Sequence, residues 1–349
     1  MFDVANRWIR PAALDAASSE ASTPSAARPS PLPSPPSTWE REGASLTLVA
    51  MSDSSTTLAD FRRYAALLDS MIPANRAFTP ATESATSIQV ERGVVLPRVL
   101  KDPADTAVDV VERLIEATAI GAFDRFAIVD AGGHHRPVYR PLLVYCWLQA
   151  FRLAYETLPR SQFGRWEEGL RPWCDLLEAE LGDMSLTNVA ASRGGVAAEA
   201  AWTALALHVA GKVYVRDAWL DLAGDTFGRL TRAQQPSGAF LQATASDNPE
   251  PNWYHELAIL HACASYAVQA EDRTVAAAVA RAVNFHVAET QPDHATEQPW
   301  GLFAFIWSPS ARPLADQLLH SMTISQPAGA HGVPLMLLAD ALYCLRLFL

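Results

Sequence analysis

The sequence has few charged residues, little basic charge and no long apolar run. Of its 349 residues 19% are charged, and the formal net charge is −11. A nucleic-acid-binding face needs clustered lysine and arginine, so this composition disfavours a general face of that kind. No apolar run reaches the roughly 18 residues that a membrane-spanning helix requires, and the N-terminus lacks the basic, apolar and small-residue order of a secretory signal. We therefore expect a cytoplasmic protein that binds neither nucleic acid nor membrane.

Cysteine is also scarce, and its spacing suits neither disulfides nor zinc. The four cysteines are Cys146, Cys174, Cys263 and Cys344, and no two of them form a Cys-x-x-Cys pair. Each stands in an apolar or helical context, where a thiol usually serves as a small buried packing group. We expect four buried thiols, no disulfide framework and no zinc site built on sulfur.

The N-terminal segment differs in composition from the rest of the chain. Alanine, serine and proline dominate residues 13–38, whereas half of the whole chain is hydrophobic. A segment of that kind buries too little apolar area to offset its conformational entropy. We predict a disordered tail over residues 1–50 and one domain over residues 51–349, with Met51 as an alternative start. The hydrophobic content is enough for a sizeable core.

Helical spacing dominates the sequence after residue 52. We expect a helix around residues 60–68, a possible strand or extended arm over 84–100, and a helix from Pro103 to about 118. Later helices are expected at roughly 138–158, 163–181, 195–211, 215–234, 254–270, 272–289, 299–307, 312–322 and 333–348. Little of this region alternates with period two, which makes a β domain unfavourable.

The predicted helices differ in kind, and the two kinds alternate. Four segments are apolar nearly all round: 142–155, 197–210, 257–268 and 333–349. Three helices carry charge on one face: 163–181, 215–234 and 272–289. A helix that is apolar all round is buried on all sides, and an amphipathic helix covers it. The order predicts a ring of helical hairpins, an α/α toroid, in which the inner helices run the same way and gather their N-termini at one end.

The end of one outer helix supports this fold by resemblance. Residues 233–240 contain Gln235, Gly238 and Phe240 in a Gln-x-x-Gly-x-Phe pattern. The segment resembles the glutamine-rich, glycine-aromatic turn of α/α-toroid proteins such as triterpene cyclases, prenyltransferases and pectate-lyase-type enzymes. Glycine supplies a backbone conformation that other residues resist after a helix, and the aromatic ring packs the returning chain. The resemblance implies an all-α, α/α-toroid fold and does not imply one activity.

Two activities of toroid proteins lack their motifs here. No Asp-x-Asp-Asp string is present for protonating a triterpene, and the zinc ligands of protein prenyltransferases have no counterpart. A looser resemblance is to α/α-barrel polysaccharide lyases, which pair tyrosine and histidine at a cleft rimmed by arginine, asparagine and tryptophan. That resemblance implies a carbohydrate-active enzyme.

Three polar loops that contain histidine open directly into predicted inner helices. They span residues 130–136, 252–256 and 293–300. The second loop matches best what β-elimination in an acidic sugar requires, because histidine can act as a base near neutral pH and tyrosine can shuttle a proton. Nearby arginine and asparagine can neutralise the sugar carboxylate. Tryptophan can stack on a sugar ring.

We therefore predict a site at the N-terminal rim of the inner helices. The predicted catalytic residues are Tyr254, His255 and His294. The predicted substrate-binding residues are His134, His135, Arg136, Arg193, Asn252, Trp253, Glu256, Glu297 and Trp300. The function expected from them is a β-eliminative lyase that acts on an acidic oligosaccharide. The alternative is a non-catalytic toroid that binds a small molecule or a protein partner.

Structural roles for the same residues remain open. Asn252 can cap its helix, Trp253 and Tyr254 can pack, and His255 can bond to a neighbouring loop. We expect His208, His261 and His286, which lie within helices, to be packed or surface side chains.

No cofactor is expected, although a divalent metal held by loop histidine and glutamate is an alternative. The candidate ligands are His134 or His135 with His255 and His294. A zinc-protease helix is disfavoured, because the histidine after His255 follows six residues later instead of four.

Overall fold

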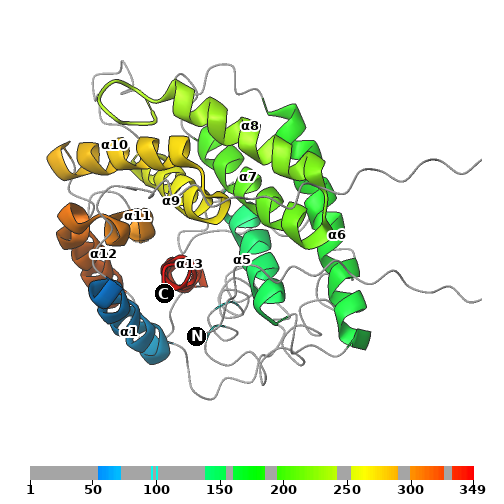
Figure 1. Ribbon diagram of the computed structural model, residues 1–349, viewed down its shortest axis with the longest axis horizontal. Coiled ribbons are helices and arrows are strands. Elements are labelled where there is room, and N and C mark those ends of the chain that lie inside the picture. The colour runs from blue at the N-terminus through cyan, green and yellow to red at the C-terminus, as the bar shows by residue number, and fades with distance from the viewer. Residues whose placement is uncertain are drawn as a thin grey trace, which may run out of the picture. The chain divides into compact units, whose positions relative to one another are not determined.

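The computed structural model describes residues 54–71, 96, 100, 138–154, 160–184, 195–241, 253–289, 299–325 and 332–349. All of them belong to one compact unit, Leu48–Leu349. Every regular element in the described residues is helical (Figure 1). The α-helices are α1 (Ser54–Met71), α5 (Tyr139–Ala154), α6 (Arg160–Asp183), α7 (Gly195–Tyr214), α8 (Asp217–Ala233), α9 (Trp253–Ala270), α10 (Arg273–Glu289), α11 (Leu302–Trp307), α12 (Arg312–Ser325) and α13 (Gly332–Arg346). A short 3-10 turn, η3 (Pro309–Ala311), joins α11 to α12.

The prediction of an all-helical chain is confirmed for the described residues. From α5 onward, helix ends fall within a few residues of those expected, and α11 begins at Leu302 instead of 299. Helix α1 extends well beyond the expected 60–68, over Ser54–Met71. The possible extended arm over 84–100 is wrong at the two positions described there, because Leu96 and Leu100 are both helical. The predicted tail over residues 1–50 and the predicted helix that begins at Pro103 lie outside the described residues.

Helices α7 and α8 show how composition sets burial. Most side chains of α7 are buried, from Ala200 to Gly211 without a break, as expected for a helix without a charged face. Helix α8 instead buries one stripe and exposes the other. Its buried residues are Trp219, Ala223, Thr226, Phe227, Leu230 and Thr231, whereas Asp217, Asp221, Asp225 and Arg229 are exposed at four-residue spacing. The prediction that an amphipathic helix covers an apolar one is confirmed for this pair, since α8 packs along α7.

The apolar helices contact one another, and the amphipathic helices lie against them (Figure 1). Helix α7 contacts α5 and α9, helix α11 contacts α9 and α13, and α13 also contacts α5. Helices α6 and α8 both pack against α7. Helix α10 packs against α9, α12 against α11, and α1 against α13. All four cysteines are buried, as predicted. None of the described helices is long and apolar enough to cross a membrane.

The turn after α8 requires glycine at one position. Gly238 has φ +101°, and a Cβ atom there would lie 2.5 Å from the carbonyl oxygen of Arg281 in α10. The Gln234 amide donates to the carbonyl oxygens of Gly238 (2.7 Å) and Ala278 (2.8 Å), so it ties the turn to α10. Phe240 is fully buried. The turn thus holds α8, α10 and the chain that leads to α9 together.

Candidate functional site

Seven of the predicted site residues lie outside the described residues: His134, His135, Arg136, Arg193, Asn252, His294 and Glu297. The structure describes the other five, which are Trp253, Tyr254, His255, Glu256 and Trp300. Four of these five form the first turn of α9.

Successive residues at the start of α9 face different neighbours, because each helical residue turns by about 100° from the last. Trp253 is half-buried, and its ring centroid lies 6.1 Å from that of Phe285 in α10. His255 is also half-buried, and two of its ring atoms lie 3.6 Å from the Cβ position of Gly195, the first residue of α7. His255 therefore sits where α7 and α9 both begin.

Tyr254 and His255 form a close pair. Their ring centroids are 5.2 Å apart and their planes meet at 88°. Tyr254 is 9% exposed and points its ring at Trp300, with centroids 5.5 Å apart. The half-buried imidazole of His255 thus lies against the phenol of Tyr254 at the edge of the core.

Glu256 anchors the turn that follows α8. Its side chain is fully buried, and its two carboxylate oxygens accept the backbone N–H groups of Phe240 and Leu241, each at 2.8 Å. Burial raises the pKa of Glu256 to about 7, although the two N–H donors oppose this shift. His286 Nε2 lies 3.9 Å from Glu256 Oε1, too far for a hydrogen bond, and burial lowers the pKa of His286 to about 3. Both oxygens of the Glu256 carboxyl group are therefore used in hydrogen bonds to the turn that follows α8.

Trp300 lies in the core, between three helices. It is fully buried and stacks on Tyr139 at the start of α5, with centroids 6.5 Å apart. It also meets Trp202 of α7 edge-on at 5.5 Å and His261 of α9 at 6.4 Å. The Trp300 ring thus packs against Tyr254 from the core side.

A cation stands at the start of α5. Arg140, the second residue of α5, forms an ion pair with Glu180 of α6. Glu199, in the first turns of α7, has its pKa raised by burial and by Glu180, while Arg140 opposes the shift. Arg140 thus places a positive charge at the start of α5, and this charge also acts on Glu199 of α7.

A second polar cluster lies deeper and was not predicted from the sequence. Asp340 of α13 is fully buried and accepts hydrogen bonds from Tyr145 of α5 and Ser265 of α9. His261 Nε2 lies 3.1 Å from its Oδ2 atom. We call Tyr145, Gln149, His261, Ser265, Gln269 and Asp340 the core network.

The two glutamines extend the core network around the tyrosine. Gln149 and Gln269 both donate to the Tyr145 hydroxyl, at 3.0 and 2.7 Å, and Gln149 also donates to Gln269 at 2.7 Å. Burial first, and then the charge of Asp340, raise the pKa of Tyr145 well above its usual value. The tyrosine therefore stays protonated and donates to the carboxylate.

The sequence does contain a signal for this cluster. In otherwise apolar helices, the polar residues recur every four positions, as in 145 and 149, and in 261, 265 and 269. Residues four apart share one face of a helix, so each helix carries a polar stripe toward its neighbours. The expectation that His208, His261 and His286 are packed is confirmed, since all three are buried.

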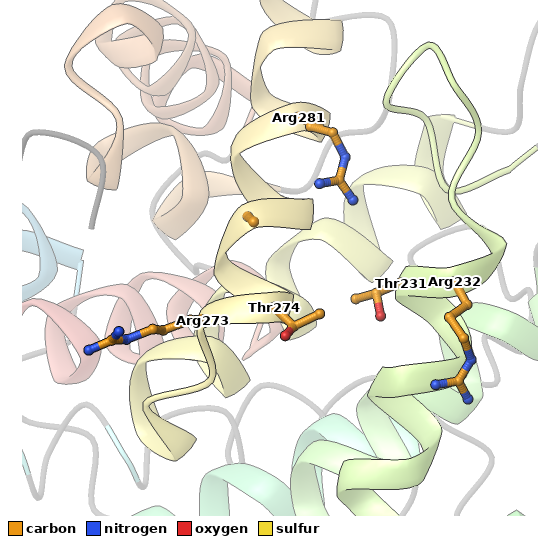
Figure 2. Close-up of a pocket in the computed structure, with 6 residues that line it drawn as sticks. Thr231, Arg232, Arg273, Thr274 and Arg281 are labelled. Atoms are coloured by element: carbon orange, nitrogen blue, oxygen red, sulfur yellow. The ribbon is translucent and has the colours of Figure 1, made fainter. Parts of the chain in front are cut away.

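A groove of about 420 Å³ lies between α8 and α10, and none of the residues discussed above lines it. Figure 2 shows its lining residues, which are Thr231, Arg232, Arg273, Thr274, Ala277 and Arg281. Arg281 donates to Gln234 Oε1 at 3.0 Å, and Arg273 extends away from the two threonines. The arginines therefore do not converge on one point of this groove.

Among the described residues, no group of three or more histidine, cysteine, aspartate or glutamate side chains could hold a metal ion. The metal alternative depends on His134, His135 and His294, which lie outside the described residues. Comparison of the chain with protein-family models, curated proteins and solved structures found no match.

Proposed function

We propose that this protein is an enzyme that transfers protons at the start of α9, with Tyr254 and His255 as its acid–base pair. The observation that carries the proposal is the edge contact of these two rings, 5.2 Å apart, beside the first residue of α7. Histidine titrates near neutral pH, and two helix N-termini add positive potential where negative charge would develop. A half-exposed imidazole backed by a nearly buried phenol suits proton transfer at the edge of a core.

The fold that we propose for this site is an α/α toroid. The contacts that run from α5 through α7, α9 and α11 to α13, and from α13 to α5, support it. In such an arrangement the starts of the inner helices share one rim. The loops with His134, His135, Arg136, Arg193, His294 and Glu297 would then border the same opening as Tyr254.

The leading chemistry is β-elimination in an acidic oligosaccharide. His255 takes the proton from the carbon beside the sugar carboxylate, a carbon–carbon double bond forms, and the bond to the leaving oxygen breaks. Tyr254 gives its proton to that oxygen. Arg136 and Asn252 bind the carboxylate, and Trp253, which is half-buried, offers a ring face to the sugar. Glu256 and Trp300 hold the start of α9 from within the core.

The test uses His255→Gln and Tyr254→Phe in the full chain, with uronic-acid oligosaccharides as substrates. The ultraviolet absorbance of the unsaturated product reports turnover. Because acid–base groups contribute about 100-fold or more, each variant should lower kcat by at least about 100-fold. His320→Gln, a change at an exposed histidine of α12, is the matched control and should keep full activity. Equal turnover in the wild type and both site variants would sink the proposal.

The second candidate is a non-catalytic protein that binds a small molecule or a protein at the same rim. It is favoured by the packing of Tyr254 on Trp300, which gives the tyrosine a structural role. Saturable binding of the same oligosaccharides without any product, measured by calorimetry and weakened by His255→Gln, would favour binding over catalysis.

A further inference from the structure

The Asp340 carboxylate fixes the imidazole of His261. Tyr145 and Ser265 both donate hydroxyl groups to Asp340, so the carboxylate acts as the acceptor at the centre of the core network. His261 Nε2, at 3.1 Å from Oδ2, is then the nitrogen that carries a proton toward Asp340. In the neutral ring this leaves Nδ1 with a lone pair.

Two buried nitrogens on neighbouring rings have no hydrogen-bond partner in the part of the chain that the structure describes. They are Nδ1 of His261 and Nε1 of Trp300, and both side chains are fully buried. A buried polar group without a partner destabilises the folded state, because it has lost its hydrogen bonds to water. In folded proteins such groups are normally satisfied by an ordered water or by a ligand.

The two rings are neighbours in the core. Their centroids are 6.4 Å apart and their planes meet at 85°. Trp202 lies against both, at 5.6 Å from His261 and 5.5 Å from Trp300, and its own N–H is already used by the carbonyl oxygen of Ala258. Trp202 therefore packs against both rings, and its N–H is not available to a ligand there.

An indole N–H only donates, and a neutral imidazole Nδ1 only accepts. One oxygen that accepts from the first and donates to the second satisfies both, and that is the oxygen of a hydroxyl group. We infer that His261 Nδ1 and Trp300 Nε1 together bind a hydroxyl oxygen, from a water molecule or from an alcohol. This inference does not rest on the proposed proton transfer at Tyr254 and His255.

Tyr254 stands seven residues before His261, which is about two turns and roughly 10 Å along the helix. It packs on Trp300. Water and an alcohol supply the same hydroxyl chemistry at this position, and the experiment separates the two sources.

The experiment follows the full chain, labelled with ¹⁵N in histidine and tryptophan, by nuclear magnetic resonance. In buffer alone, the Trp300 indole proton should show a nuclear Overhauser effect to a long-lived water. Ethylene glycol is then added as a small probe with sugar-like hydroxyls. New cross-peaks from Trp300 to the glycol protons identify a position that alcohols reach, whereas an unchanged water signal identifies a position held by water.

Trp300→Phe removes the donor and keeps an aromatic ring. It should move the His261 Nδ1 resonance toward that of an imidazole without a hydrogen bond. Trp219→Phe is the matched control, since Trp219 is also buried and its Nε1 also has no partner in the described part, yet it packs on Tyr214. The control should leave His261 unchanged. A wild-type Trp300 indole with neither water nor glycol cross-peaks overturns the inference, whether or not the variant folds.

Discussion

Asp340 is the residue on which the core network depends. It accepts from Tyr145 and Ser265, it faces His261, and the thiol of Cys344 lies 3.8 Å from its Oδ1 atom. These groups come from α5, α9 and α13, which are distant in sequence. Each of these groups loses its acceptor if the Asp340 carboxylate is removed, and none can hydrogen-bond to solvent instead, because all of them are buried.

Asp340→Ala should therefore destabilise the protein strongly. Removing one partner from a buried charged network costs about 3–5 kcal/mol, and urea unfolding followed by circular dichroism measures the loss. Asp316→Ala is the control, because Asp316 pairs with Arg63 at the surface, where both side chains are about half exposed (58% and 48%). An exposed pair contributes about 0–1 kcal/mol. Similar losses in the two variants would contradict a structural role for the core network.

At this scale the sequence pointed to the start of α9 but not to the core network. Tyr254 and His255 could be singled out because they stand in one polar loop before an apolar run. Asp340 could not, because its meaning depends on Tyr145 and His261, which lie on other helices. The four-residue spacing shows that a helix has a polar stripe, but it does not show which helices turn their stripes toward each other. The predicted site residues in the loops outside the described residues, such as His134 and His294, stay predictions.

Helices α7 and α8 approach closely at Gly211, near the end of α7. A Cβ atom there would lie 2.7 and 2.8 Å from two side-chain carbons of Leu220 in α8, and 3.1 Å from the carbonyl oxygen of Arg216. The Arg216 backbone is held in place, since Arg216 also donates its backbone N–H to the carbonyl oxygen of Gly211 at 2.9 Å. The glycine thus allows the tight connection between these two helices.

Gly211→Ala should destabilise the protein by about 1–3 kcal/mol, the usual cost of overpacking, even though alanine favours a helix. Gly164→Ala in α6 is the matched control, because nothing lies within 4 Å of its Cβ position. That change should stabilise the protein by up to about 1 kcal/mol. Thermal unfolding of both variants measures the difference, and opposite signs are expected. A shift of the same sign in both would show that the approach of α8 is not limited by Gly211.

Helix positions were predictable because they depend on local periodicity. The segments around α7, α9 and α13 are apolar nearly all round, and each became a buried helix close to the expected bounds. The expectation of an extended arm is wrong at Leu96 and Leu100, because a few apolar residues fit a strand and a buried helix equally well. Contacts between helices required the structure, since the periodicity of one helix carries no information about its neighbour.

At the scale of the whole molecule, buried groups with opposite pKa shifts set the response to acid. Burial lowers the pKa of His208 to about 3, with Lys212 adding to the shift, and burial raises the pKa of Glu256 to about 7. Between pH 5 and 6 the folded chain keeps His208 neutral and Glu256 protonated. On unfolding, the histidine takes up a proton and the glutamate releases one, so their contributions to the pH dependence of stability cancel.

Single substitutions should separate these two contributions. The unfolded histidine binds a proton that the folded one lacks, so His208 makes stability rise with pH over this window, and Glu256 makes it fall, each by about 1.4 kcal/mol per pH unit. Glu256→Gln should therefore steepen the rise of the unfolding free energy between pH 5 and 6, and His208→Gln should flatten it, as measured by urea unfolding at several pH values. All other groups titrate alike in the variants and in the wild type, so only the difference in slope is read. If either substitution left the slope unchanged, that group would carry the same charge in the folded and the unfolded chain over this pH range. For Glu256, the carbonyl infrared band of the buried carboxyl under the Gly238 turn would then show whether it is ionised.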